Sequence, residues 1–336
     1  MEAALEQVRI AVQEHQYFGI TTHINPDGDG IGSELALARL LQDLQKNVIV
    51  VNSTPIPQNY CFLDRKGEVR IFNPRCTEEL DRVQVIFVCD ISRWERLGPM
   101  NDYIRSHRAL KICIDHHPVF ENFADINLIC QDACASGEIV LDLITSLKHE
   151  LSPQIAEPLY ASILTDTGAF RFPNTNAKTH AAAARLLNTG ISSSEIYERI
   201  YERCSPARIK LLGMALCGVE YLHKGRLAWT TITQSMMRRT GVEPEEIEGF
   251  ADMARCIRSV EASLLFIELN DGKIKISLRS KGTVDVNRFA SQFGGGGHRH
   301  AAGILMTGHI HTVIRQILEA SSSLFPVADH PLVKHQ

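Results

Sequence analysis

The stretch HINPDGDG, residues 23–30, decides how this 336-residue chain is interpreted. Polar residues recur at every second position in it: His23, Asn25, Asp27 and Asp29. An extended segment places alternate side chains on one side. Two anionic carboxylates held close together repel each other unless a cation lies between them. The stretch therefore predicts a site for a cation.

The residues that follow predict a tight turn into a helix. We interpret the glycines at 28, 30 and 32 as that turn, and the apolar spacing of residues 32–45 is typical of an amphipathic helix. Ser33 and Glu34 suit its first turn. Three known ligand loops are excluded. An EF-hand loop from Asn25 would need an acid at Ala36, a dinucleotide fingerprint needs glycine at Ser33, and a P-loop needs a Gly-Lys-Ser/Thr that is absent.

The first half of the chain alternates apolar strands with helices. Further strands are predicted at 47–52, 83–91 and 110–117, and helices at 137–151 and 153–168. Continuously apolar strands between helices predict a buried parallel sheet, an α/β fold with helices on both faces. Ligands of such sheets bind beyond the carboxyl ends of the strands. The polar residues at the strand ends are therefore expected to converge.

Four segment ends together supply six ligand-type side chains. Asp90 follows one strand, the tripeptide Asp115-His116-His117 follows another, and Asp166 ends a helix. With those of the first stretch, the expected ligands are His23, Asp27, Asp29, Asp90, His116 and Asp166. Six oxygen and nitrogen ligands suit two ions such as Mn²⁺, with Mg²⁺ as an alternative. A paired site indicates phosphate-ester hydrolysis, and a structural zinc site is disfavoured because no cysteine has ligand spacing.

The second half predicts a smaller α+β domain. Residues 1–188 form the predicted first domain, 189–205 a helical linker, 206–325 the second domain and 326–336 a tail. An Asn-Asp-Gly sequence at 270–272 predicts a hairpin turn in the second domain. We expect the active-site cleft between the two domains.

The second domain carries a candidate anion site. The glycine run 294–297 can surround an anion with backbone N–H groups, and Arg279 offers a bidentate fork to phosphate. His298 follows the run directly, and Ser280 follows Arg279. Flexible-loop and surface-arginine interpretations of the same residues stay open at this point.

Composition restricts the partners and the compartment. The net charge is −4, with 18 basic and 26 acidic residues in 1–200 against 17 and 13 in 201–336. This does not suit binding of long duplex nucleic acid. No apolar stretch reaches the ~18 residues of a membrane helix, and the acidic start does not resemble a signal peptide. Nine cysteines without a CxxC pair predict reduced thiols in the cytoplasm.

Taken in order, five segments resemble the DHH family of phosphoesterases. Four segments resemble the N-terminal motifs of this family: HINPDGDGIGS (23–33), VCDISRWERLG (88–98), DHHP (115–118) and LTDTGAFRF (164–172). Residues 277–303, SLRSKGTVDVNRFASQFGGGGHRHAAG, resemble the DHH-associated C-terminal domain. The resemblance covers almost the whole chain, and the set in this order is far more specific than each piece.

The resemblance implies a site for two Mn²⁺ ions, with Mg²⁺ or Co²⁺ as alternatives. One ion would be held by His23, Asp27 and Asp90, and the second by Asp29, Asp90, His116 and Asp166, so that Asp90 bridges them. Asp115 would orient a histidine, and His117 would face the substrate phosphate. The implied substrate contacts beyond His117 are Arg279, Ser280, Gly295, Gly296, His298 and, more weakly, Arg171.

The implied reaction is hydrolysis of short oligoribonucleotides to 5′-mononucleotides, or of the 3′,5′-bisphosphate nucleotide pAp to AMP and phosphate. A metal-bridged hydroxide would attack phosphorus. Alternatives are a linear or cyclic dinucleotide phosphodiesterase and a non-catalytic nucleotide sensor. Family II pyrophosphatases carry SRKKQ where this chain has SLRSKG, and RecJ-type exonucleases are usually longer. A homodimer is compatible with these expectations.

Overall fold

The computed structural model describes residues 1–91, 93–118, 124–247 and 249–325. The chain divides into two compact units, Met1–Arg203 and Cys204–Gln336, and the predicted tail at 326–336 lies outside the described residues. Each unit has its own six-stranded sheet and its own hydrophobic core. The division after Arg203 falls inside the segment predicted as a linker.

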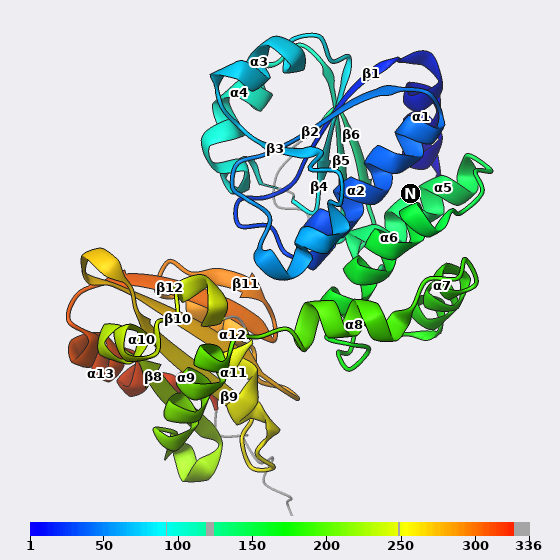
Figure 1. The fold of residues 1–336 in the computed structure, drawn as a ribbon. Coiled ribbons are helices and arrows are strands. Elements are labelled where there is room, and N and C mark those ends of the chain that lie inside the picture. Colours follow the sequence, from blue (N-terminus) through cyan, green and yellow to red (C-terminus); the bar gives the residue numbers. More distant parts are fainter. Residues whose placement is uncertain (92, 119–123, 248, 326–336) are drawn as a thin grey trace, which may run out of the picture. The chain divides into compact units, whose positions relative to one another are not determined.

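The first unit is built on a fully parallel sheet (Figure 1). Its strands are β1 (Tyr17–Thr21), β2 (Asn47–Asn52), β3 (Val69–Ile71), β4 (Val85–Cys89), β5 (Leu110–Asp115) and β6 (Ile126–Ile129). Their order in the sheet is β3-β2-β1-β4-β5-β6. The chain thus builds outward from β1 in one direction and then continues from β4 in the other. The point between β1 and β4, where this order reverses, is the preferred ligand position of such sheets.

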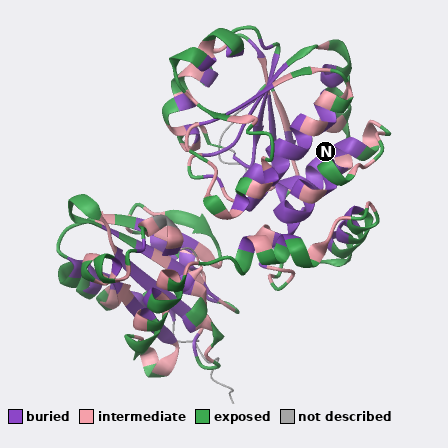
Figure 2. Cartoon of the chain, in the orientation of Figure 1, coloured by how far each residue is buried: buried purple, intermediate pink, exposed green. Residues whose placement is uncertain are grey.

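Helices cover both faces of this sheet, which confirms the predicted α/β architecture (Figure 1). One face packs against α1 (Glu2–Glu14), α2 (Gly28–Asp43), α5 (Ser136–Ser146) and α6 (Pro153–Asp166), with α7 (Ala177–Leu187) and α8 (Ser193–Tyr201) beyond them. The opposite face packs against α3 (Pro74–Leu80), the short helix η2 (Trp94–Met100) and α4 (Asn101–Ser106). The central strands are buried between the two layers (Figure 2).

Helix α2 begins four residues earlier than the sequence predicts. It starts at Gly28, and the Asp27 side chain caps it by accepting hydrogen bonds from the backbone N–H groups of Asp29 and Gly30 at 3.1 and 3.2 Å. The predicted turn through the three glycines is therefore wrong. None of the three adopts a positive φ, so their backbone freedom is not what the fold uses here.

These glycines instead permit close packing of α2. A Cβ atom at Gly28 would meet the Thr165 side chain, one at Gly30 would meet Thr22 Oγ1, and one at Gly32 would meet the Pro158 carbonyl oxygen. Any side chain would push α2 away from β1 or from α6. The glycines thus keep the first turn of α2, and the two aspartates at its start, close to the sheet.

The second unit contains a mixed sheet of order β11-β12-β10-β9-β8-β7. Its strands are β7 (Glu220–Leu222), β8 (Leu227–Ile232), β9 (Ala262–Glu268), β10 (Lys273–Ser280), β11 (Gly296–His298) and β12 (Ala301–Thr307). All neighbours are antiparallel except β8 and β9. The predicted turn at Asn270–Gly272 joins β9 to β10.

Helices pack on both faces of this second sheet. The helices are α9 (Pro206–Cys217), α10 (Gln234–Thr240), α11 (Phe250–Met253), α12 (Val286–Ser291) and α13 (Ile310–Ala320). Helices α12 and α13 cover one face, and α9, α10 and α11 cover the other face over β8 and β9. Within the described ranges of both units, no helix is long and apolar enough to cross a membrane.

Candidate active site

The predicted metal ligands come together at the carboxyl ends of the central strands. His23 lies two residues after β1, Asp90 directly follows β4, and Asp115 ends β5. Asp29 lies in the first turn of α2, and Asp166 is the last residue of α6. The cluster therefore sits at the point where the strand order reverses.

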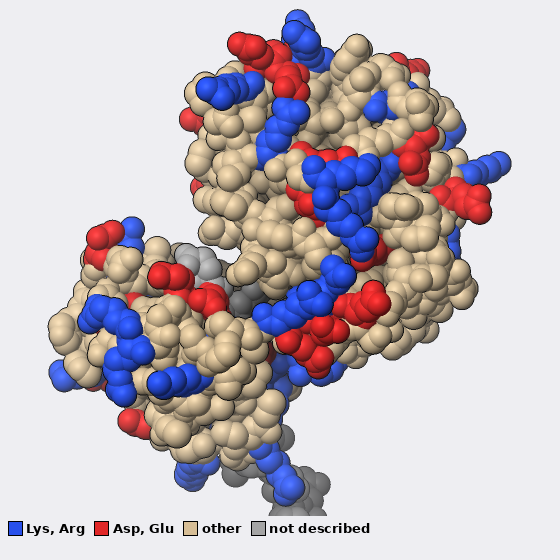
Figure 3. All heavy atoms as spheres, viewed as in Figure 1, with Lys and Arg blue, Asp and Glu red and all other residues tan. Residues whose placement is uncertain are grey.

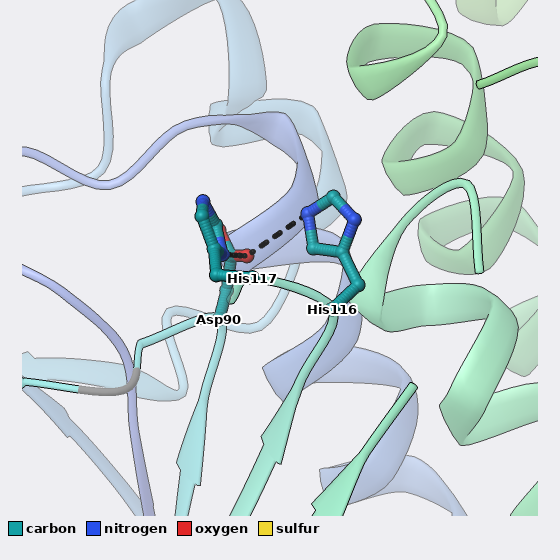
Figure 4. Close-up of side chains that lie close together, drawn as sticks. All are labelled: Asp90, His116 and His117. Carbon is teal, nitrogen blue, oxygen red and sulfur yellow. Dashed lines mark ion pairs between the residues drawn. The ribbon is translucent and has the colours of Figure 1, made fainter. Parts of the chain in front are cut away.

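Asp90 lies beside three histidines of this cluster, of which His116 and His117 are drawn with it in Figure 4. Its carboxylate is buried, with Oδ2 at 3.4 Å from His23 Nε2 and Oδ1 at 3.7 Å from His116 Nε2 and 3.5 Å from His117 Nδ1. Its backbone has a φ of 62°, a left-handed conformation that is strained for residues other than glycine, asparagine and aspartate. A backbone hydrogen bond of 2.8 Å from its N–H to the Ile114 carbonyl oxygen holds it there. Because an aspartate tolerates this conformation, the residue type and this hydrogen bond together fix the direction of the carboxylate.

The donor atoms fit the spacing of ligands around metal ions. Three groups offer donor atoms within 4.8 Å of one another: His23, Asp27 and Asp90; Asp29, His116 and Asp166; and Asp90, His116 and His117. His116 Nε2 lies 3.6 Å from an oxygen of Asp29 and 3.6 Å from one of Asp166. These separations exceed hydrogen-bond lengths. Two ligands at ~2.1 Å from one shared ion lie roughly this far apart.

A buried ring nitrogen supports the same interpretation. His23 Nε2 is buried and has no hydrogen-bond partner among the residues that the structure describes. Leaving such an atom unsatisfied costs about 1–3 kcal/mol, and a metal ion is a partner for a neutral imidazole nitrogen. Carboxylate oxygens and imidazole nitrogens are both common ligands of divalent metal ions. The residues present therefore fit a metal centre.

The cluster's protonation reflects its burial. Burial and the neighbouring Asp90 carboxylate raise the pKa of Asp29 to about 7, and burial raises the pKa of Asp166 well above its ordinary value. Burial alone would lower the pKa of His23, but Asp27 and Asp90 raise it to about 10. Without an ion, the cluster thus takes up protons near neutral pH. A bound cation would replace those protons.

Asp115 lies behind the histidines and is fully buried. Its Oδ1 accepts hydrogen bonds from the backbone N–H of His116 at 2.8 Å, the backbone N–H of His117 at 3.1 Å and His117 Nδ1 at 2.6 Å. The last bond places the ring proton on Nδ1 and leaves Nε2 facing away from the carboxylate. Burial would lower the pKa of His117, but Asp115 and Asp90 raise it.

Comparison with known proteins identifies the family. Residues 18–163 match the DHH family N-terminal domain, and residues 229–325 match the DHHA1 domain. The bifunctional oligoribonuclease and PAP phosphatase NrnA of Thermus thermophilus is 32% identical over 306 residues, which cover 90% of this chain and 88% of the relative. The chain belongs to the DHH family.

Other proteins support the assignment over the whole length of this DHH protein. The protein of the same description from Bacillus subtilis is 31% identical over 286 residues, covering 84% of this chain and 86% of the relative. The solved structure of an exopolyphosphatase-related protein from Bacteroides fragilis superposes with a TM-score of 0.90 at 28% identity, covering 96% of this chain and 98% of that one. As a DHH phosphoesterase, the chain is a hydrolase that acts on phosphoric ester bonds.

A buried glutamate behind the site was not predicted from the sequence of this DHH protein. Glu34 is fully buried, and its Oε1 accepts a hydrogen bond of 2.7 Å from Asn52 Nδ2. Asn52 Oδ1 in turn accepts from the Thr22 backbone N–H at 3.3 Å, next to His23. The expectation that Glu34 lies in the first turn of α2 is wrong, because α2 starts at Gly28 and turns this residue toward the core. Burial raises the pKa of Glu34 to about 8, although the Asn52 amide opposes the shift.

We expect Glu34→Gln to change how stability depends on pH. Because the folded pKa is raised above 4.5 to about 8, the stability due to the neutral carboxyl is complete below about pH 4.5 and is lost as pH rises through about 8. Each pKa unit corresponds to about 1.4 kcal/mol. Between pH 5 and pH 9, the unfolding free energy of the variant relative to wild type should rise by a few kcal/mol, measured by urea unfolding. A constant difference across that range would show that Glu34 is already ionised in the fold.

Arg171 is not a member of the three groups that could hold a metal ion in this DHH protein. Gly168, Ala169 and Phe170 all have positive φ values of 56–63°. Arg171 Nε donates to the Gly168 carbonyl oxygen at 2.7 Å, which closes this turn. Asn174, which was not predicted from the sequence, donates from Nδ2 to the Asp166 backbone oxygen at 3.1 Å and to its Oδ2 at 3.3 Å. An asparagine that holds an aspartate from eight residues away has no sequence signature.

In the second unit, Arg279 is held by an aspartate. Arg279 Nε donates to Asp252 Oδ2 at 3.2 Å, and Arg255 pairs with Asp252 Oδ1 at 2.8 Å. Ser280 is buried, and its hydroxyl donates to the Val284 carbonyl oxygen at 2.8 Å. The serine side chain thus faces the domain interior, because successive side chains of β10 alternate between the faces of the sheet.

The second half of the glycine run belongs to an edge strand of the second sheet. Gly296 to His298 form β11, which pairs with β12 at Gly303 to Ala301. A Cβ atom at Gly295 would meet the Gly303 carbonyl oxygen. Close approach of two backbones therefore explains that glycine without any ligand. Gly296 and His298 are exposed on this strand.

Proposed function

We propose that this DHH protein is an Mn²⁺-dependent phosphoesterase that hydrolyses short oligoribonucleotides to 5′-mononucleotides and pAp to AMP and phosphate. The observation that carries the proposal is the position of Asp90, whose two carboxylate oxygens face different histidines, His23 and His116. That position suits a carboxylate shared by two ions. The names of the relatives from Thermus thermophilus and Bacillus subtilis support the substrate class.

The proposed ligand sets follow the geometry. His23, Asp27 and Asp90 would hold one ion, and Asp29, Asp90, His116 and Asp166 the second. Bound divalent ions supply Lewis-acid stabilisation of phosphoryl oxygens and lower the pKa of a coordinated water. We propose Mn²⁺ because imidazole and carboxylate ligands are mixed, with Mg²⁺ and Co²⁺ as alternatives.

The residues around the metal ligands would orient the substrate. We propose that His117 Nε2, directed by the bond from Nδ1 to Asp115, contacts a phosphoryl oxygen of the substrate. In both reactions an oxygen of water adds to phosphorus, and the bond between phosphorus and O3′ breaks. The leaving O3′ retains the electron pair and takes up a proton. One arrangement of side chains therefore serves both substrates.

Product analysis on a substrate panel tests the proposal. The panel contains pAp, di-, tri- and pentanucleotide RNA, cyclic di-AMP and pyrophosphate, each with Mn²⁺. We expect AMP from pAp and 5′-mononucleotides from the short RNAs. Turnover confined to cyclic di-AMP or to the dinucleotide would favour a dinucleotide phosphodiesterase, and binding without turnover of any substrate would favour a nucleotide sensor.

Surface charge favours small substrates. On the face drawn in Figure 3, acidic and basic side chains are interspersed over both units, and the net charge of the chain is −4. Binding of a long duplex depends on many phosphate contacts by clustered basic residues. We therefore expect a trinucleotide to be degraded much faster than duplex DNA or structured RNA, as measured at equal nucleotide concentration. Equal rates would contradict this preference.

The free cysteines favour a location in a reducing compartment. All nine cysteines are free, and five of them are buried or half-buried. Disulfides are rare where glutathione and thioredoxin keep thiols reduced. We propose a cytoplasmic location on this basis.

We propose that the second unit selects the substrate through Arg279, with Gly295, Gly296 and His298 nearby in the sheet. The Arg279 guanidinium is oriented by Asp252, and a planar fork recognises a terminal phosphate. Arg279→Ala should raise the Michaelis constants for pAp and short RNA roughly ten- to a hundredfold, because a charge-assisted hydrogen bond contributes about 1.5–3 kcal/mol. Hydrolysis of bis-nitrophenyl phosphate, which has no second phosphate, should barely change.

The matched control is Arg226→Ala. Arg226 forms a two-point ion pair with Glu261 in the same unit, so this variant removes an arginine of equal type without touching the proposed contact. Equal losses on all three substrates in Arg279→Ala would instead assign the arginine to the chemical step.

A further inference from the structure

The carboxylate of Asp29 has an unusually complete set of hydrogen-bond donors. Its Oδ1 accepts from Ser162 Oγ at 2.5 Å, Ser33 Oγ at 3.1 Å and the Gly137 backbone N–H at 3.1 Å. Its Oδ2 accepts from the Ser136 backbone N–H at 2.8 Å. Donors from α2, α5 and α6 thus meet on one side chain that is 1% exposed.

Ser162 occupies the point where these three helices meet. It lies on α6, is fully buried, and faces glycines on both other helices. A Cβ atom at Gly32 of α2 would lie 2.8 Å from Ser162 Cβ, and one at Gly137 of α5 would lie at the same distance and would also meet Ser162 Oγ. Two glycines on different helices therefore make room for a single serine. The packing of the first unit brings this hydroxyl to Asp29.

The donors are distributed unequally between the two oxygens of Asp29. Three of them saturate Oδ1, because a carboxylate oxygen offers about two lone-pair directions. Oδ2 has one donor and lies 3.6 Å from His116 Nε2, on the side of the other ligands. Only Oδ2 therefore retains a lone pair that faces the proposed metal centre.

We propose that Ser162 is a positioning residue that fixes the Asp29 carboxylate so that it binds its ion through Oδ2 alone. The inference rests on the proposed metal centre, since it concerns the ligand set of the ion that Asp29 shares with His116 and Asp166. Ser162 does not touch the ion or the substrate. It acts by restricting the rotation of Asp29, as hydrogen-bond partners of metal ligands do.

Mn²⁺ titration of the metal-free protein tests this role independently of activity. Two binding steps should be resolved for wild type by calorimetry, with paramagnetic resonance reporting coupling between the two ions. In Ser162→Ala, one step should weaken roughly ten- to a hundredfold, the coupled signal should fall at subsaturating Mn²⁺, and the other step should be unchanged. Asp29→Asn identifies the step concerned, because it should weaken that same step further.

Ser263→Ala is the matched control. Like Ser162, Ser263 is a buried serine, but it lies in the second unit and its hydroxyl donates to a backbone carbonyl oxygen, that of Ala251, at 2.7 Å. Both Mn²⁺ steps should be retained in this variant.

A second variant gives a milder test of the same binding step. Alanine fits the space at position 162 without a new contact. Ser33→Ala removes another donor to Asp29 Oδ1.

The outcomes separate this inference from the proposed function. If Ser162→Ala, or Ser33→Ala where the former does not fold, binds both ions with wild-type affinity, Ser162 serves only the packing of the helices and the inference is overturned. If wild type itself binds fewer than two ions, the proposed metal centre has failed, and that result is visible before any variant is compared.

Discussion

Asp90→Asn should reduce turnover of pAp and short RNA by roughly a thousandfold or more while leaving the fold intact. Metal-based charge stabilisation contributes several kcal/mol to such a reaction, and each ~1.4 kcal/mol corresponds to a factor of ten in rate. Asparagine preserves the size of the side chain and tolerates the left-handed backbone at φ 62°. The charge that faces His23 and His116 is removed with little other change. Steady-state kinetics with saturating Mn²⁺ measures the loss.

The chain offers a close control for this substitution. Asp271 also has a φ of 62°, in the turn between β9 and β10 of the second unit. Asp271→Asn exchanges the same groups on the same backbone conformation and should leave turnover unchanged. Retained activity in Asp90→Asn, or equal losses in both variants, would contradict a metal-bridging role for Asp90.

Mn²⁺ should raise the melting temperature of the metal-free protein by about 10 °C or more at pH 8. At a free ion concentration a hundred times the dissociation constant, each site adds about 2.7 kcal/mol of stability. For a unit of this size, one kcal/mol shifts the melting temperature by about 2–4 °C. Scanning calorimetry of chelator-treated protein, with and without Mn²⁺, measures the shift. An unchanged melting temperature would contradict the metal centre.

The stabilisation by Mn²⁺ should increase as pH rises from 5 to 8. The pKa of Asp29 is raised from 3.8 to about 7 and that of His23 from 6.5 to about 10. Each protonated group stabilises the folded state fully when the pH is below its ordinary pKa. This stabilisation is lost as the pH rises through the raised pKa of the folded protein. The pKa values of Asp27 and Asp90 are lowered, so their contributions are lost only on acidification below the tested range.

The metal-free protein should therefore become less stable toward pH 8, while the ion-bound protein avoids most of that loss because the ion replaces the protons. Asp29→Asn should flatten the pH dependence of the metal-free protein. A stabilisation by Mn²⁺ that is independent of pH would show that the cluster does not exchange protons for ions.

The sequence indicated which residues form the candidate site, but it did not indicate which residues hold them in place. Asp90 and Asp115 stand directly after uninterrupted apolar runs, so the ends of two buried strands can be recognised from local pattern alone. The parallel arrangement follows from the same apolar runs and from the helices between them. The edge strands β3 and β6 were missed because three or four residues with partly exposed side chains carry almost no periodic signal.

The start of α2 was missed for a different reason. Glycines spaced two apart favour a turn when only local backbone freedom is considered. Their use in this protein depends on neighbours far away in sequence, such as Pro158 beside Gly32. The same limitation applies to Ser162, since a hydroxyl on an apolar helix gives no local indication that it faces a carboxylate 133 residues earlier.

The strand order of the first unit has a consequence for synthesis of the chain on the ribosome. Chains fold from the N-terminus as they emerge, and β1, β2 and β3 can assemble one half of the sheet early. The opposite half contributes Asp90 and His116, and Asp166, the last of the proposed ligands, stands at the end of α6. When only the first three strands have left the ribosome, His23, Asp27 and Asp29 are exposed without the proposed ligands Asp90, His116 and Asp166. On the proposed ligand sets, the set of His23, Asp27 and Asp90 is complete once β4 has left the exit tunnel, whereas the set that includes Asp166 is complete only when α6 has emerged. The second ion would therefore stabilise a nearly finished unit rather than nucleate its folding.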